Sequence, residues 1–377
     1  MSYSENRKIA IVHEWFDKYA GSERVVEQLL EIYPDADLFA MVDFLPAGER
    51  SFIKDKFVKT TFIQRMPFAR KKFRHYLAFF PMAIEQIDLR QYDIIISSSH
   101  AVAKGILTNA DQLHICYCHS PMRYAWDLYH PYLEEAGLKK GLRAFLAKWV
   151  LHYLRQWDQS THHRVNYFVA NSNFVGRRIQ NIYGRTYRLI YPPVDTMRFI
   201  LPAQREEYYF TAARMVPYKK LDMIAAAFRK MPDKKLIIVG HGPGMKKVKA
   251  AAGSNVTIHA GLSGEQFQQY LIHAKAFVYA AEEDFGIVMA EAQSAGVPVI
   301  AYHKGGAAEI VHHGRTGILY PHQTEESLVE AVQQFEKTSF DNQVIRDEAQ
   351  RFSIASFKQN FRDYTDACCR EFFNLNP

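Results

Sequence analysis

The stretch AFVYAAEEDFGIVMAEA (Ala276–Ala292) decides the fold. Its apolar start, residues 276–281, predicts a buried strand, and residues 287–295 predict a helix. Glu283 therefore lies just after a strand, whereas Glu291 lies on the helix that follows. Open α/β sheets bind their ligands there, outside the carboxyl ends of the strands. A carboxylate pair at that place offers acceptors for the hydroxyl groups of a polyhydroxylated ligand.

Short apolar runs alternate with helical patterns along the whole chain. Most of the runs are continuous, which is typical of parallel strands covered on both faces by helices. The alternation predicts an α/β protein with two doubly wound, Rossmann-like domains. The expected strands are 8–12, 37–42, 93–97, 114–118, 167–170, 188–191, 208–213, 235–239, 256–260, 276–279, 299–301 and 317–320. The expected helices include 23–33, 218–229, 264–273 and 324–337.

The segment Tyr191–Asp195 (YPPVD) is rigid and cannot continue a helix, because it contains two prolines. It begins a linker that we place at about 193–206. We therefore expect a first domain over 1–193 and a second over 194–355. The last helix, 356–377, follows a sheet that should already be complete, so we expect it to cross back to the first domain.

Composition indicates an ordinary soluble globular protein, with 48% hydrophobic and 23% charged residues among 377. The net charge of +7 fits an anionic ligand, an anionic membrane surface or nucleic acid, and selects none of them. No apolar run is long enough to span a membrane, and the polar start shows no secretion signal. The four cysteines have no Cys-x-x-Cys spacing, so we expect a cytoplasmic protein with reduced thiols.

Residues 54–80 combine basic and aromatic side chains more densely than the rest of the chain. Such a mixture suits an anionic membrane surface, where aromatic rings enter the interface and cations meet lipid phosphates. It equally suits a lid packed on its own domain, and a nucleic acid is a third, weaker interpretation. We expect no nucleic-acid partner and keep the first two. The basic members are Lys54, Lys56, Lys59, Arg65, Arg70, Lys71, Lys72 and Arg74.

Arg214 and Lys219 follow a predicted strand and open a predicted helix. Two positive charges near a helix start can clamp a pyrophosphate, although a solvated basic turn explains the pattern as well. Glycine turns after other strands, at Gly21, at 240–244 and at 305–306, would let a ligand approach the backbone closely. No turn is a clean dinucleotide fingerprint, because Pro243 interrupts the best of them.

His119 follows the strand 114–118 and begins the loop HSPMRYAWD. A histidine at a strand end is well placed to hydrogen-bond a ligand, although a structural role fits as well. We expect no metal there, because Cys116 and Cys118 would lie on the strand face opposite His119. The chain also lacks Gly-x-Ser-x-Gly, His-Glu-x-x-His and Asp-x-Asp, so hydrolase, zincin and Asp-x-Asp transferase sites gain no support.

Together these motifs resemble the retaining glycosyltransferases of the GT-B fold, the large family 4 or group 1. The resemblance covers nearly the whole chain, is strong in the second domain and is looser between 37 and 90. His119–Asp127 is similar to the mannosyltransferase-type members of bacterial polysaccharide assembly. The stretches that carry the likeness are 169–172 (VANS), 191–195 (YPPVD), Arg214 with Lys219, 240–243 (GHGP), 283–299 and 305–309 (GGAAE).

The resemblance implies a GT-B fold whose donor site lies in the cleft between the two domains. It implies catalytic roles for Glu283, His119, Arg214 and Lys219. Arg214 and Lys219 would hold the donor diphosphate, Glu283 and His119 would contact the donor sugar, and Glu291 would accept from the ribose hydroxyls. The remaining donor-binding residues would be Gly21, Gly242, Phe285, Gly286 and Ile287. Two residues depart from the family pattern: Lys220, where many members carry glycine, and Ser22, where glycine or alanine is common.

The implied activity is hexosyl transfer from a nucleotide sugar to a glycan or polyprenyl-diphosphate-linked acceptor in bacterial polysaccharide, lipopolysaccharide or O-antigen assembly. GDP-mannose is the favoured donor, and UDP-sugars are the alternative. The family implies retention of configuration, with same-face attack favoured over double displacement, and neither a cofactor nor an obligatory metal. We expect a cytoplasmic location, with 54–80 as a candidate contact with the inner face of the membrane. The other hypotheses are a GT-B epimerase, a non-catalytic sugar-nucleotide sensor and a nicotinamide-dependent oxidoreductase.

Overall fold

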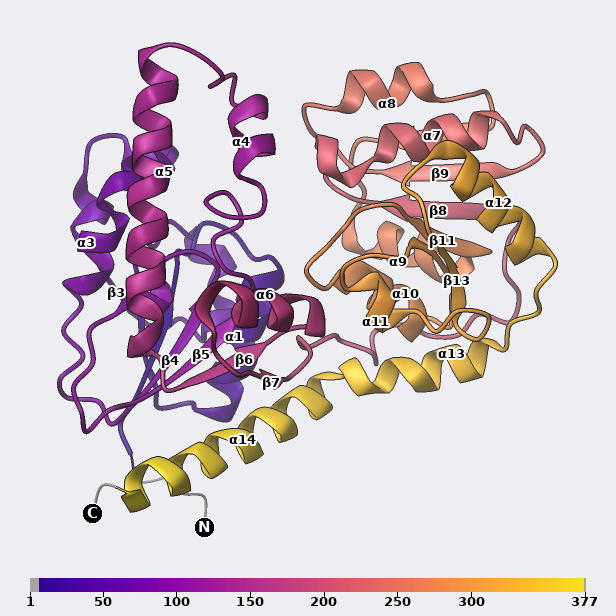
Figure 1. Ribbon diagram of the computed structural model, residues 1–377. Helices are drawn as coiled ribbons and strands as arrows, with labels where there is room; N and C mark the ends of the chain where they lie inside the picture. Colours follow the sequence, from indigo (N-terminus) through magenta and orange to yellow (C-terminus); the bar gives the residue numbers. More distant parts are fainter. Residues whose placement is uncertain (1–6, 376–377) are drawn as a thin grey trace. The chain divides into compact units, whose positions relative to one another are not determined.

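The computed structural model describes residues 7–375 and divides the chain into two compact units (Figure 1). Unit 1 comprises residues 1–193 and 357–377, and unit 2 comprises residues 194–356. Residues 1–6 and 376–377, which include the ends of the expected first domain and last helix, lie outside the described part. Each unit is built on its own parallel sheet, and the predicted α/β class is confirmed.

The sheet of unit 1 has seven parallel strands in the order β3-β2-β1-β4-β5-β6-β7. Its strands are β1 (Ile9–His13), β2 (Asp37–Ala40), β3 (Val58–Thr60), β4 (Ile94–Ser99), β5 (Leu113–Cys118), β6 (Tyr167–Ala170) and β7 (Arg188–Leu189). Its helices are α1 (Gly21–Ile32), α2 (Ala69–Lys72), α3 (Phe80–Glu85), α4 (Tyr129–Glu135), α5 (Leu142–Thr161), α6 (Asn173–Tyr183) and, from Phe357 on, α14 (Ile354–Leu375). The prediction missed the short edge strand β3, because this strand lies within the basic and aromatic segment 54–80.

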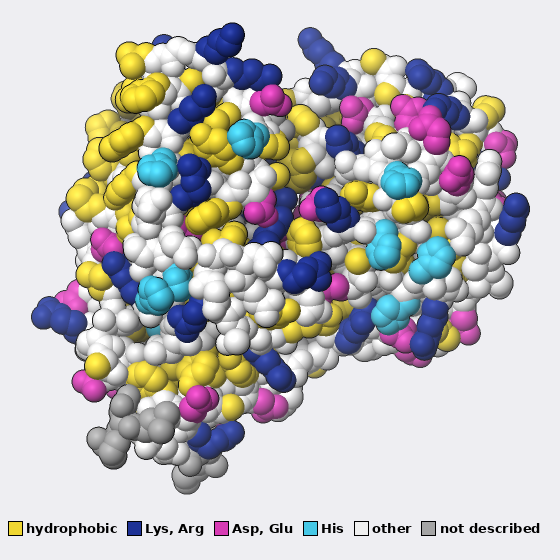
Figure 2. All heavy atoms as spheres, in the orientation of Figure 1, with side chains coloured by type: hydrophobic (Ala, Val, Ile, Leu, Met, Phe, Trp, Pro, Cys, Tyr) yellow, Lys and Arg dark blue, Asp and Glu magenta, His cyan; other side chains and the backbone are white. Residues whose placement is uncertain are grey.

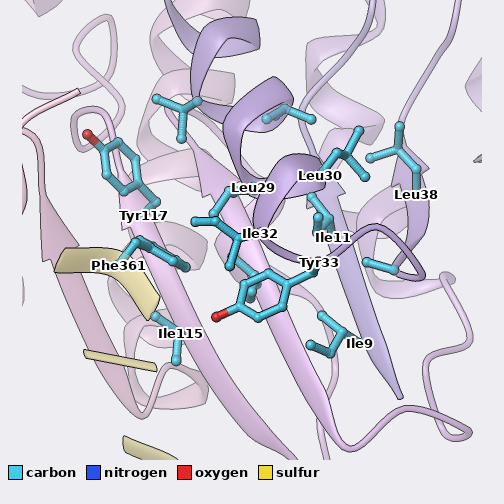
Figure 3. Close-up of a cluster of buried hydrophobic side chains, with 14 of the residues drawn as sticks. Ile9, Ile11, Leu29, Leu30, Ile32, Tyr33, Leu38, Ile115, Tyr117 and Phe361 are labelled. Carbon is cyan, nitrogen blue, oxygen red and sulfur yellow. The ribbon is translucent and has the colours of Figure 1, made fainter. Parts of the chain in front are cut away.

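Apolar side chains fill both faces of this sheet, as the continuous apolar runs predict. Along β1, Ile9 and Ile11 point into one core cluster while Ala10 and Val12 point into another, because successive strand residues alternate between faces. Figure 3 shows the first cluster, where β1 residues pack with Leu29 of α1. The second cluster contains residues of α3 and α5, so helices cover both faces of the sheet.

The last helix, α14, completes the first core cluster of unit 1. Phe357 and Phe361 are buried, and their rings contact the ring of Tyr117 on β5. Cys368 and Cys369, near the far end of the helix, are buried in the same cluster. Figure 3 shows Phe361 among the residues of this cluster. The chain thus leaves unit 2 after Ser356 and contributes one more helix to unit 1.

The sheet of unit 2 has six parallel strands in the order β10-β9-β8-β11-β12-β13. Its strands are β8 (Tyr208–Ala212), β9 (Lys235–Val239), β10 (Val256–His259), β11 (Ala276–Tyr279), β12 (Val299–Tyr302) and β13 (Gly317–Tyr320). Its helices are α7 (Leu221–Arg229), α8 (Met245–Ala251), α9 (Gly264–His273), α10 (Ile287–Ser294), α11 (Ala307–Ile310), α12 (Glu325–Glu336) and α13 (Asn342–Ala349). The predicted helix 218–229 begins only at Leu221, because Lys220 adopts a left-handed conformation with φ of 55°.

Both sheets reverse their direction of growth at one point. In unit 1 the order reverses between β1 and β4, and in unit 2 it reverses between β8 and β11. The loops that leave neighbouring strands at such a point run in opposite directions and expose the carboxyl ends of the strands between them. These two edges are therefore the places where each unit is best built to bind a ligand.

Residues 54–80 contribute apolar side chains to the core of unit 1 and expose the others at the surface. Phe73 and Phe80 are buried in the second cluster of unit 1, and other apolar residues of the segment pack against it. Phe57 and Phe68, in contrast, are each 82% exposed. The lid interpretation thus accounts for most of the aromatic residues, and a membrane contact here stays a prediction. No helix within residues 7–375 meets the length and apolarity needed to cross a bilayer.

Candidate functional site

The carboxyl edge of the unit 2 sheet carries the charged residues that the sequence singled out. The loop after β8 holds Arg214 and leads into the 3₁₀ turn Pro217–Lys219, and the loop after β11 holds Glu283. Because β8 and β11 are neighbours at the point where the strand order reverses, their loops meet. The structure thus places the basic pair and the first glutamate of the opening motif on neighbouring loops of one sheet edge.

Lys219 and Glu283 form an ion pair, and the Lys219 ammonium also donates to the Tyr279 hydroxyl at 3.0 Å. Both charged side chains are largely but not fully buried, with 14% and 18% of their surfaces exposed. Burial, with the nearby Glu283 carboxylate, raises the pKa of Tyr279 well above its usual range, so its hydroxyl stays protonated. The ammonium is therefore held in a fixed position at the edge, with a face still open to solvent.

Arg214 differs from Lys219 in its surroundings. Its side chain is exposed, and within residues 7–375 no hydrogen bond or ion pair engages its guanidinium. A guanidinium of this kind keeps its five donors available for an anion. The edge thus combines one positioned cation with one cation that is ready to bind.

Gly305 and Gly306, in the turn that follows β12, hold the loop that carries Glu283 in place. The Gly306 N–H donates to the Glu283 carbonyl at 2.9 Å, and Gly305 forms a bridge with the same residue. A Cβ at Gly306 would lie 2.0 Å from the Phe285 carbonyl oxygen, and one at Gly305 would lie 2.3 Å from that of Glu283. Only glycine permits this approach of two backbones, so the 305–306 turn acts as a brace for the carboxylate loop.

The glycines of 240–244 brace the Arg214 loop in the same way. The Met215 N–H donates to the His241 carbonyl at 2.8 Å, and the Gly244 N–H donates to the Met215 carbonyl at 2.8 Å. Gly242 has φ of 148°, and a Cβ there would lie 2.6 Å from the Met215 carbonyl oxygen. Gly242 therefore acts on the loop beside Arg214, and its direct contact with a donor stays a prediction.

The other predicted donor-binding residues lie at the start of α10. Gly286 has φ of 96° and forms the N-terminal boundary of the helix, which begins at Ile287. Phe285 is buried and its ring contacts the Phe352 ring, which fixes the turn. Glu291 lies one turn into the helix and is 8% exposed. A helix start beside two cations offers N–H donors to an anion at the same edge.

His119 belongs to a histidine cluster at the carboxyl edge of the unit 1 sheet. Ser98, near the end of β4, is hydrogen-bonded to His119 Nε2 at 2.8 Å and to His13 Nδ1 at 3.1 Å. The His100 ring lies 6.2 Å from the His119 ring and 6.3 Å from the His13 ring, between centroids. The three histidines, at or just after the ends of β1, β4 and β5, thus lie close together near the point where the strand order reverses.

Two histidines of the cluster, His119 and His100, favour the neutral imidazole. Burial, reinforced by repulsion from His100 and His13, lowers the pKa of His119 well below its usual range. Burial also lowers the pKa of His100, against the attraction of the Glu14 carboxylate. A neutral histidine can both donate and accept a hydrogen bond, which suits contact with a sugar hydroxyl better than an imidazolium does.

Gly21 begins α1 at this same edge, and Glu23 ties it to the histidines. The Glu23 carboxylate accepts from the Ala20 N–H and the Ser22 hydroxyl, both at 3.0 Å, and bonds His13 Nε2 at 3.3 Å. Burial acts to raise the pKa of Glu23, but the hydrogen bonds and the His13 interaction lower it to about 2. Gly21 and His119 therefore share one hydrogen-bonded edge within unit 1.

Sequence reasoning missed the support beneath this edge. Glu14 is fully buried, and its carboxylate accepts the backbone N–H groups of residues 100–103 and the Ser99 hydroxyl, at distances of 2.7–3.0 Å. These bonds fix the loop that carries His100. One signal for this support was present in the sequence. The apolar strand ends in the polar residues 97–100 (SSSH), and polar residues are unusual in a buried segment.

No metal cluster accompanies these residues in the part of the chain that the structure describes. Within residues 7–375, His, Cys, Asp and Glu side chains do not gather in threes as metal ligands would. The four cysteines are buried and unpaired. The expectation that no metal is obligatory stays a prediction.

Part of the chain is similar to curated mannosyltransferases. It is 31% identical over 194 residues to the GDP-mannose-dependent alpha-(1-6)-phosphatidylinositol monomannoside mannosyltransferase of Mycobacterium tuberculosis. The match covers 43% of this chain and 50% of the relative, so the chain spans about half the length of the curated relatives it matches. The corresponding enzyme of Mycolicibacterium smegmatis is 30% identical over the same length.

Solved structures show the same fold over almost the whole chain. Sucrose-phosphate synthase from Thermosynechococcus elongatus matches with a TM-score of 0.71 at 17% identity, covering 98% of this chain and 100% of that one. The Anabaena HepE protein in complex with UDP and glucose matches with a TM-score of 0.67 at 16% identity, covering 96% and 99%. Two sheets of this kind give the GT-B architecture that the sequence predicted.

Family models cover both units. The model described as Glycosyltransferase Family 4 matches residues 19–198, and the model described as Glycosyl transferases group 1 matches residues 194–355. Together the two matches run from the first glycine turn to the start of α14, and they include the residues described at both edges except His13 and Glu14. The chain belongs to the group 1, family 4 glycosyltransferases.

Proposed function

We propose that this glycosyltransferase moves mannose from GDP-mannose to a glycan or polyprenyl-diphosphate-linked acceptor, with retention of configuration and without an obligatory metal. The observation that carries the proposal is the edge of unit 2, where an exposed guanidinium, a positioned ammonium and a helix start lie together. These are the groups that stabilise a departing nucleoside diphosphate. The place of the reaction in polysaccharide, lipopolysaccharide or O-antigen assembly is part of the same proposal.

Lys219 and Arg214 would act on the leaving group. As the bond from the sugar anomeric carbon to the phosphate oxygen breaks, negative charge grows on the diphosphate. Lys219 would then exchange part of its pairing with Glu283 for the phosphate oxygens, and Arg214 would add a bidentate contact. Glu283, released from the full charge of the ammonium, would accept from the sugar hydroxyls.

Retention is proposed through attack on the face that the diphosphate leaves. The acceptor oxygen forms the new bond to the anomeric carbon, and its proton passes to the departing phosphate oxygen. A double displacement would instead need a carboxylate nucleophile beside the anomeric carbon. Glu283 is paired with Lys219, and Glu291 is largely buried on α10, so neither is presented as a free nucleophile.

The choice of donor rests on the relatives. The names of the mycobacterial relatives specify GDP-mannose, and these relatives are 30–31% identical to the chain over 194 residues. The HepE structure contains UDP and glucose, but at 16% identity that likeness shows the fold alone. GDP-mannose is therefore the donor to test first, with UDP-glucose as the comparison.

Transfer assays with alanine variants test the proposal. Lys219→Ala and Arg214→Ala should each lower kcat for mannosyl transfer by about 10²–10³-fold, because each removes a charge that stabilises the leaving group. Release of GDP and formation of the glycosylated polyprenyl-diphosphate sugar are measured together. Lys230→Ala is the matched control, since Lys230 is an exposed lysine of unit 2 paired with Glu325 and Glu326.

The same assay separates the alternatives. Normal turnover in both site variants would overturn the proposal. Isomerised donor in the absence of acceptor would identify an epimerase, and donor binding without GDP release would identify a sensor. Nuclear magnetic resonance of the product decides the stereochemistry, with retention expected. Unchanged activity in excess chelator is expected if no divalent metal is needed.

A further inference from the structure

Helix α5 (Leu142–Thr161) has two apolar faces, although it lies at the surface of unit 1. Its inner face is part of the second core cluster, through buried residues such as Leu151 and Leu154. Its outer face exposes a stripe of five large side chains, with exposed fractions between 39% and 74%. The stripe consists of Leu142, Phe145, Leu146, Trp149 and Tyr153.

The spacing puts these five side chains on one side of the helix. Steps of three and four residues return to the same face, so the stripe runs along about three turns of α5. Trp149 and Tyr153 stack with ring centroids 6.3 Å apart and planes 13° apart. A solvated helix face normally carries polar residues here, so a contiguous exposed apolar stripe indicates a binding surface.

The exposed charges of α5 itself are all positive. Arg143 and Lys148 lie on α5 itself, both are exposed, and no ion pair engages either within residues 7–375. The single acidic residue of α5 is Asp158, which is fully buried and paired with the buried Lys104 at 2.9 Å. Figure 2 shows hydrophobic and basic side chains together over the upper part of α5.

The buried face fixes how α5 can engage a partner. Asp158 also accepts hydrogen bonds from Trp126 at 2.8 Å and from Tyr183 at 2.9 Å, so the helix is tied to its own unit. Breaking such a buried pair would be costly, so α5 stays in place and offers only its outer side chains. A partner must therefore be a broad surface that accepts apolar side chains and carries negative charge.

We propose that the outer face of α5 binds an anionic lipid surface, with the stripe inserted at the headgroup level and the flanking cations on lipid phosphates. Trp and Tyr favour this interface, because their rings are apolar and their N–H and O–H groups stay hydrated. A second copy of this chain fits less well, because symmetric pairing would bring together two faces that each carry Arg143 and Lys148 and no exposed acidic residue of α5. This surface is distinct from residues 54–80, where the sequence suggested a membrane contact.

Co-sedimentation of the full chain with vesicles tests the proposal. Vesicles of phosphatidylglycerol and phosphatidylcholine in equal parts should bind the protein at low salt, and pure phosphatidylcholine vesicles should bind it far less. Phe145→Ser with Trp149→Ser should weaken binding at least about tenfold, because two large apolar side chains no longer enter the interface. Arg143→Gln with Lys148→Gln should weaken it by a similar factor, because each cation contributes about fivefold near an anionic surface.

Matched variants keep the result interpretable. Met197→Ser with Ile200→Ser removes two exposed apolar side chains from unit 2, which are 76% and 70% exposed, and should leave binding unchanged. Phe68→Ser tests the basic segment directly and should also leave it unchanged. Trp149→Phe should keep binding but abolish the blue shift of tryptophan fluorescence on vesicle addition, because Trp149 is the exposed tryptophan of the described chain.

Three results would overturn the proposal. They are no pelleting of the wild type with anionic vesicles, wild-type binding in the Phe145/Trp149 variant, and a loss of binding in Phe68→Ser alone. A change from dimer to monomer in the α5 variant, without vesicle binding by the wild type, would show self-association instead. Neither donor nor acceptor is present, so failure here is independent of failure of the proposed transfer.

Discussion

The ion pair between Lys219 and Glu283 explains why the two opening glutamates have different roles. Its partners are 64 residues apart, so no local pattern could predict it. Local spacing did place Glu283 at a strand end and Glu291 on the next helix, and the structure has them there. The sequence predicted where the glycine turns lie but not what each glycine does. A glycine that lets a ligand approach and one that braces another loop look the same in sequence.

Gly306→Ala tests the brace at the scale of one residue. The new Cβ would lie 2.0 Å from the Phe285 carbonyl oxygen, so the loop that carries Glu283 must move. We expect the free energy of unfolding to fall by about 2 kcal/mol or more, and donor affinity to weaken with it. Gly48→Ala is the control, because nothing lies within 4 Å of its Cβ. Equal stabilities of the two variants in urea titrations would contradict the brace.

At the scale of elements, strands and helices were predictable because both sheets are parallel and buried on both faces. Continuous apolar runs such as 235–239 and 276–279 have the bounds that the sequence predicted. The edge strand β3 was missed, since its apolar residues are few and its neighbours are basic. The Glu14 contacts to residues 100–103 span more than 80 positions, which lies beyond any periodicity.

The histidine edge of unit 1 should make stability depend on pH. Burial, with repulsion from the neighbouring histidines, lowers the pKa of His119 in the folded chain well below the unfolded value of about 6.5. Stability is then complete above about pH 6.5 and falls as the pH drops, because protons bind the unfolded chain more tightly. Glu23, whose pKa is lowered to about 2, adds a further loss below about pH 4.5.

Urea unfolding of the wild type and His119→Gln between about pH 8 and pH 5 measures this effect. The wild type should lose stability on acidification, and the variant should lose less because it lacks the base whose pKa is lowered in the folded chain. A free energy of unfolding that stays constant over this range would contradict the assignment of a neutral imidazole to His119.

At the scale of the whole molecule, two parallel sheets offer one ligand edge each. The alternation of the sequence predicted both sheets, and the motifs predicted which loops would carry charge. The outer face of α5 was not predicted, because its inner and outer apolar residues merge into one hydrophobic pattern along the sequence. Only the structure separates the side chains that fill the core from those that remain exposed.

The central claim is that Arg214 and Lys219 bind the diphosphate of the donor. Isothermal titration of GDP into the wild type, Arg214→Ala, Lys219→Ala and the control Lys230→Ala tests it most directly. Each site variant should weaken GDP binding by about 10–100-fold, as expected when a charge-assisted hydrogen bond is lost, while the control keeps wild-type affinity. Wild-type affinity for GDP in both site variants would contradict the account.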